Sequence, residues 1–172
     1  MDQTEVGLKA VVKALTDTIA GAIDPADHLA KEQLRLAASY VDFVRQRLHL
    51  IHARERYDLT RAIALARDLD ALGPPDGAAT QSLRARLAEA APLADDAAAL
   101  TGEVRLAAME LAHAVAGLVQ EAHRARWPIA GAIDRAVLTA SEARFEMERL
   151  WYQPIGFDQS PPKGARLEDH LR

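Results

Sequence analysis

Apolar residues recur at intervals of three and four along most of the chain, and this spacing predicts α-helices. The longest predicted helix contains no glycine or proline and lies between Asp24-Pro25 and Gly73-Pro74-Pro75. Aspartate caps helix N-termini, proline fits the first turn, and glycine followed by proline ends a helix. The predicted helices and the irregular C-terminal tail cover residues 4–23, 26–72, 78–127, 128–152 and 154–172.

Proline and glycine residues between these segments predict how the helices are arranged. The cluster Gly73-Pro74-Pro75-Asp76-Gly77 indicates a tight reversal, so the helices before and after it form a long antiparallel hairpin. The two shorter helices flank one half of this hairpin. The predicted fold is all-α, an up-down helical bundle in a single domain over 1–153. Pro92 either kinks the helix 78–127 or ends it, with Asp95 or Asp96 capping the next helix, and the sequence leaves both open.

The far half of the hairpin is apolar although no other helix of the chain is predicted to cover it. Exposed apolar surface favours association, so we expect a homodimer through residues 48–105. In the alternative, the chain breaks at Pro92 and residues 78–91 fold back over the second helix. The apolar residues concerned are Leu48, Ile51, Leu59, Ile63, Leu69, Leu72, Leu83, Leu87, Leu93 and Leu100.

Composition and charge agree with a helical protein and exclude several classes of function. Alanine supplies 36 of the 172 residues, and aromatic residues only 5%, which favours closely packed helices. The formal net charge is −4 without a basic arm, so we expect no nucleic-acid partner. The chain has no cysteine, which excludes disulfides and thiolate chemistry. No apolar run reaches the length of a membrane span and no leader is recognisable, so we expect a cytoplasmic location.

One pair of residues has the spacing of a metal site. Glu110 and His113 form an E-x-x-H motif on a helix, and Glu142 and Glu146 are predicted to lie at the same level on the next helix. A di-metal bundle requires two such motifs, and the sequence has one. Helical periodicity also places Glu110 on the solvent side, so the preferred interpretation is a hydrated surface, with a divalent metal site as the alternative. No cofactor is predicted.

Arginines spaced seven residues apart suggest a second type of site. Arg47, Arg54 and Arg61 share one stripe of the long helix, and guanidinium groups bind phosphate well. The alternative, which we prefer, is that their aliphatic stems cover an apolar seam and their charges pair with neighbouring acids.

The sequence contains no phosphate-binding loop and no triad-like arrangement of nucleophile and base. We therefore expect a non-catalytic helical protein that acts through self-association or docking of a protein partner by its long hairpin. The alternative is a metal- or small-ligand-binding bundle, or an enzyme, with a carboxylate/His site between its third and fourth helices.

Overall fold

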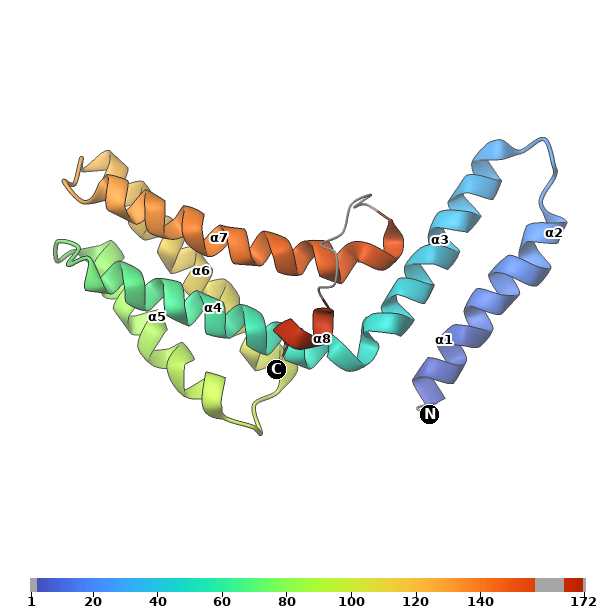
Figure 1. Cartoon of the computed structure of the whole chain (residues 1–172), viewed down its shortest axis with the longest axis horizontal. Coiled ribbons are helices and arrows are strands. Elements are labelled where there is room, and N and C mark those ends of the chain that lie inside the picture. Colours follow the sequence, from blue (N-terminus) through green and yellow to red (C-terminus); the bar gives the residue numbers. More distant parts are fainter. Residues whose placement is uncertain (1–2, 157–165, 172) are drawn as a thin grey trace. The chain divides into compact units, whose positions relative to one another are not determined.

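The computed structural model describes residues 3–156 and 166–171 of the chain. Within these ranges the chain forms helices joined by turns, with no strand, which confirms the predicted all-α class (Figure 1). The middle of the predicted tail, 157–165, lies outside the described residues. No described helix is both long enough and apolar enough to span a membrane.

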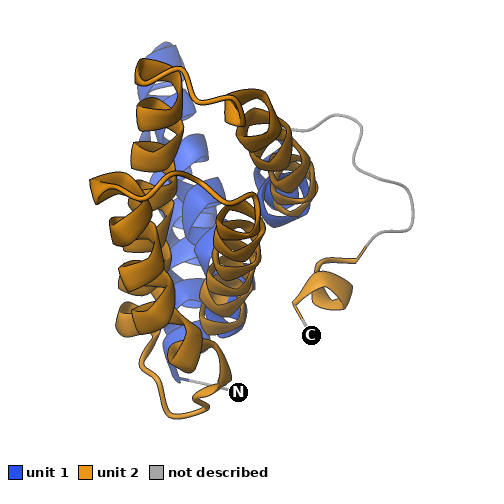
Figure 2. Cartoon of the chain, turned by 90° about the vertical axis from the view of Figure 1, so that its left-hand side faces the viewer, with its two compact units in different colours: residues 1–50, 148–165 blue, residues 51–147, 166–172 orange. Residues whose placement is uncertain are grey.

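The contacts group the chain into two compact units, whereas the sequence suggested one domain over 1–153. Unit 1 comprises residues 1–50 and 148–165, and unit 2 comprises residues 51–147 and 166–172 (Figure 2).

Unit 1 is built on a helical hairpin. Its first arm consists of α1 (Gln3–Lys13), a π-helical stretch (Ala14–Ile19) and α2 (Ala20–Ala22). Its second arm is α3 (His28–Arg47), which lies antiparallel beside the first (Figure 1). The N-cap of α3 is Asp27 rather than Asp24, because the Asp27 carboxylate accepts a hydrogen bond of 2.9 Å from the Ala30 N–H.

The predicted long helix 26–72 is present as a helical run over 28–71, which tightens to a 3₁₀ turn near its middle. A 3₁₀ turn over Leu48–Leu50 separates α3 from α4 (Ile51–Ala71), and the border between the two units falls directly after this turn. The predicted end of the helix is close to the observed one. Gly73 adopts a φ of 67°, and its N–H donates to the Asp70 carbonyl at 3.0 Å, as expected for a glycine that closes a helix.

Unit 2 is a bundle of α4, α5 (Ala78–Asp95), α6 (Thr101–Arg124) and most of α7 (Ala130–Tyr152). The helices α4, α5 and α6 pack on one another in pairs, and Ile133 of α7 joins the same core. Leu167 of the short helix α8 (Leu167–His170) is also buried. The fully buried leucine and isoleucine side chains of this core are Leu59, Leu69, Leu83, Leu111, Leu118 and Ile133.

The structure differs from the predicted hairpin in the segment 78–127. Pro92 remains inside α5, and the helix breaks at Asp96–Leu100 instead. Two local interactions stabilise this break. The Asp96 carboxylate accepts from the Ala98 N–H at 2.8 Å, and the Glu103 carboxylate accepts from the Leu100 N–H at 2.9 Å, which caps α6.

After this break, α6 runs along α4, and the first turns of the two helices lie side by side. His52 Nδ1 and Thr101 Oγ1 lie 2.9 Å apart, and Arg105 forms a 2.7 Å ion pair with Glu55. Both α5 and α6 therefore cover α4, much as in the fold-back alternative, although not at Pro92. Because Leu59, Ile63, Leu69 and Leu83 are buried within the chain, the dimer through 48–105 remains a prediction without the open seam that suggested it.

Candidate association surface

The first arm of the unit 1 hairpin packs loosely. None of its residues from Gln3 to Ala22 is buried, and α3 buries only Ala38 and Phe43. Ala38 lies seven residues before Arg45, which contacts Glu5 of α1, so Ala38 and Arg45 share the face of α3 that α1 covers. This face holds the two arms together.

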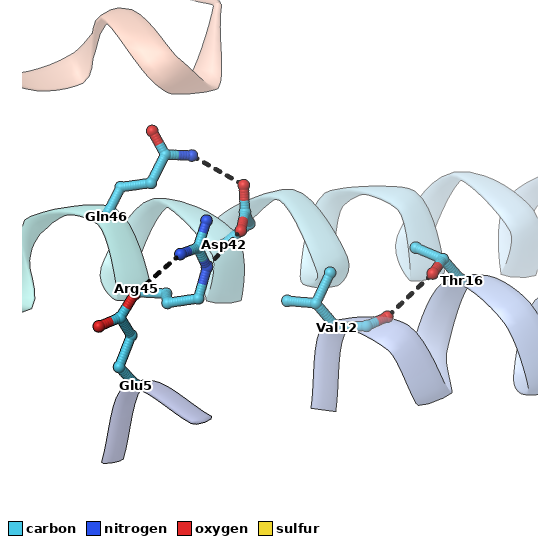
Figure 3. A network of polar contacts seen from close by, with 6 residues as sticks. All are labelled: Glu5, Val12, Thr16, Asp42, Arg45 and Gln46. Atoms are coloured by element: carbon cyan, nitrogen blue, oxygen red, sulfur yellow. Dashed lines mark hydrogen bonds and ion pairs between the residues drawn. The ribbon is translucent and has the colours of Figure 1, made fainter. Parts of the chain in front are cut away.

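A polar network fastens one end of the two arms (Figure 3). Arg45 donates to Asp42 at 2.8 Å and lies 3.5 Å from the Glu5 carboxylate of α1. Gln46 donates to the other oxygen of Asp42 at 2.7 Å. The hydrogen bond from Arg45, supported by the one from Gln46, lowers the pKa of the Asp42 carboxyl against the opposing effect of burial. Further along the first arm, the Thr16 hydroxyl of the π-helical stretch donates to the Val12 carbonyl at 3.1 Å.

Replacing Asp42 with asparagine is expected to lower the free energy of unfolding at pH 7 by at most about 1 kcal/mol, the usual value of an accessible ion pair. Because the pKa of Asp42 is lower in the folded state, its contribution is complete above the ordinary value of 3.8 and is lost as the pH falls through the folded-state pKa. Urea unfolding of the wild type and Asp42→Asn between pH 7 and pH 3 measures this difference, with Asp68→Asn on the exposed side of α4 as control. A difference between wild type and Asp42→Asn that does not change with pH would contradict the assignment.

A second apolar face of α3 lies opposite the face that α1 covers. Leu29, Leu36 and Phe43 are spaced seven residues apart, and Tyr40 lies between the last two at helical spacing. Phe43 is buried, but the exposed fractions of Leu29, Leu36 and Tyr40 are 71%, 46% and 59%. The helix is thus apolar on two opposite sides and open along most of one of them.

The last turn of α7 covers the closed end of this second face. Phe43 stacks on Tyr152 at a centroid distance of 5.6 Å and meets the Trp151 ring edge-on at 6.4 Å. Arg47 donates to the carbonyls of Trp151 at 3.0 Å and Leu150 at 3.2 Å. Carbonyls in the last turn of a helix lack intrahelical donors, and a cation there also interacts well with the helix dipole. These contacts therefore hold the last turn of α7 against the C-terminal end of this face of α3.

The residues of the alternative metal site are not gathered into one cluster. Glu110 and His113 on α6 and Glu142 and Glu146 on α7 are all exposed, and Glu110 forms a 3.1 Å ion pair with Arg86. In the described part of the chain, no three histidine, aspartate or glutamate side chains are arranged to hold a metal ion.

The three arginines considered as an alternative anion site each make contacts within the chain. Arg47 belongs to unit 1 and caps α7, as described above. Arg54 is buried and its Nε lies 2.9 Å from Asp58, while Arg61 lies over the Tyr57 ring at 5.4 Å and donates to its hydroxyl at 3.3 Å. The contact of Arg54 with Asp58 is an ion pair of the kind the preferred interpretation expects, whereas the contacts described for Arg47 and Arg61 are with carbonyls and an aromatic ring.

Sequence reasoning missed one arginine with a clear structural role. Arg56 donates to the carbonyl of Asp96 at 2.8 Å and to that of Ala94, both at the C-terminal end of α5. Arg56 lies within a run of arginines and histidines, and nothing in this pattern distinguishes it from the neighbouring arginines.

Comparisons of the chain with protein-family models, curated proteins and solved structures gave no match.

Proposed function

We propose that this protein is a non-catalytic helical protein that acts by helix–helix association, and that α3 is the helix that associates. One observation carries the proposal: α3 has apolar residues on two opposite sides, and α1 covers only one of them. A helix that is apolar on both sides is typical of the interior of an assembly.

The energy available from covering the open side is substantial for a single helix. Leu29 and Leu36 are both far from buried, and burying a leucine side chain fully contributes about 1.5–3 kcal/mol. Tyr40 adds an aromatic ring with a polar end, a type of residue that is enriched at protein interfaces. These three side chains supply the driving force that association through α3 requires.

The proposed mode of action, helix–helix association, agrees with the expectation from the sequence. The proposed surface, however, lies on α3 and not within residues 48–105. Much of the apolar seam within 48–105 is buried within the chain's own α4, α5 and α6, although Leu100 is 67% exposed, whereas the open side of α3 is not covered in the same way. No observation among the described residues favours the alternative of a metal-binding bundle.

Light scattering on the purified chain tests the proposal. We expect a mass above the 18.7 kDa of one chain when the protein is concentrated from about 10 to about 500 µM, the range in which small interfaces associate. Leu36→Gln should weaken this association by about 10- to 100-fold, since it removes one buried leucine at nearly unchanged helix propensity.

The matched control is Leu138→Gln on α7 in unit 2, where the leucine is 66% exposed. This variant should associate as the wild type does. A constant mass of one chain over the whole range, or an equal loss of association in both variants, would overturn the proposal.

A further inference from the structure

The open side of α3 has the spacing of a coiled-coil seam. Leu29, Gln33, Leu36 and Tyr40 follow one another at intervals of four, three and four residues, as a and d positions do. We call these four residues the open stripe. Resting on the function proposed above, we propose that the partner is a second copy of this chain, and that the two α3 helices pair antiparallel through their open stripes.

Steric bulk at one end of the stripe selects the antiparallel direction. Trp151 and Tyr152 pack against Phe43, so the position that continues the open stripe beyond Tyr40 is already occupied. A parallel pair would bring two such occupied ends to the same level. In the antiparallel pair that places Leu29 opposite Tyr40, Phe43 lies beyond His28, the first residue of the other α3. Antiparallel helix dipoles also attract each other.

Charged residues beside the stripe are self-complementary in this arrangement. Glu32 and Arg35 form an ion pair of 2.6 Å on α3, and both side chains are exposed. When Leu29 lies opposite Tyr40, Glu32 of one copy comes within about 3 Å along the axis of Arg35 of the other. The twofold symmetry repeats the same attraction, so that four charges alternate in sign across the pair.

On the other flank of the open stripe, small side chains allow the backbones of the two α3 helices to approach each other. Ala30 and Ala37 lie there, and neither has a side chain long enough to hold the helices apart. Gln33 faces the region of Leu36 of the other copy. A single polar residue in an apolar seam disfavours shifted registers, because a shift buries it without a polar neighbour.

Charge reversal tests the pairing of Glu32 with Arg35. Glu32→Arg makes both positions positive and Arg35→Glu makes both negative, so each variant alone should associate about 10-fold more weakly than the wild type. An equimolar mixture of the two variants should recover association close to the wild-type level. Both variants lose the ion pair within the helix equally, so recovery in the mixture reports contacts between copies alone.

Disulfide trapping tests the direction of the pair, since the chain has no cysteine of its own. Mixing Leu29→Cys with Tyr40→Cys under mild oxidation should yield mainly the mixed disulfide, because only opposed residues bring their Cβ atoms to bonding distance. Leu138→Cys on α7 serves as the control for random collision.

Three results would overturn the inference. If Leu29→Cys cross-links mainly to itself, the pair is parallel. If the chain associates but the charge variants do not recover on mixing, another surface is used, and the proposed function stands while this inference fails. Absence of any association in the light-scattering experiment overturns both.

Discussion

Replacing Leu83 with alanine is expected to lower the free energy of unfolding by about 2–5 kcal/mol, the range for a leucine truncated in a packed core. Leu83 lies on α5, is fully buried, and belongs to the core shared by α4, α5, α6 and α7. The substitution removes its buried methyl groups and leaves a cavity among side chains that relax only in part. Because the contacts of Leu83 come from its own chain, the loss should be the same at all protein concentrations.

Urea unfolding at protein concentrations of about 5 and about 200 µM measures this loss, since unfolding linked to dissociation shifts its midpoint with concentration. The control is Leu106→Ala on α6, where the leucine is 56% exposed and the cost should stay below about 0.5 kcal/mol. If the effect of Leu83→Ala depends on concentration, Leu83 contributes to an interface between copies, as the dimer through 48–105 requires.

Replacing Arg56 with methionine is expected to lower the free energy of unfolding by about 1.5–3 kcal/mol, the range for hydrogen bonds from a charged donor. The Arg56 guanidinium donates to the Asp96 and Ala94 carbonyls where α5 ends. These carbonyls have no donor within their own helix, so the variant leaves them dependent on water. Methionine keeps the unbranched apolar stem, so the substitution isolates the loss of the charged group.

Chemical denaturation of Arg56→Met and of the control Arg67→Met compares two arginines of the same helix. Arg67 is exposed, and its replacement should change the free energy of unfolding by less than about 0.5 kcal/mol. An equal cost for the two variants would show that the contacts of Arg56 at the end of α5 contribute little to stability.

Helix ends were predictable where a local signal determines them. The turn after α4 was expected at Gly73 because two prolines follow it, and Gly73 has the positive φ that such an ending requires. The start of α3 was misplaced by a few residues. Asp24 and Asp27 are both suitable capping residues, and only the observed hydrogen bond to Ala30 distinguishes them.

The break between α5 and α6 was harder to predict because two local signals compete. Pro92 is the stronger helix breaker, yet it lies within the last turn of α5, where few further hydrogen bonds depend on it. Asp96 and Glu103 instead form the side-chain hydrogen bonds that stabilise the break. The sequence indicated Asp96 as a candidate capping residue, but it did not show whether the helix would break at Pro92 or at Asp96.

For the candidate sites, the sequence predicted which residues share a helix face but not which groups they contact. The spacing of Arg47, Arg54 and Arg61 places them on one side of a helix, but it does not identify the groups they meet. Arg47 meets the end of α7, and Arg61 lies against Tyr57 on its own helix. The E-x-x-H spacing of Glu110 and His113 likewise did not show that Glu110 forms an ion pair with Arg86.

By itself, the sequence determined that the protein is all-α, approximately where most of its helices begin and end, and that the chain reverses after Gly73. These properties depend on hydrogen bonds and backbone angles within a few residues, which local sequence controls. Only the tertiary structure decided which apolar faces are covered, because the covering helix is distant in the sequence and each stripe accepts more than one partner. For that reason the seam of α4 proved to be buried by α5 and α6, and the open side of α3 became the candidate surface for association.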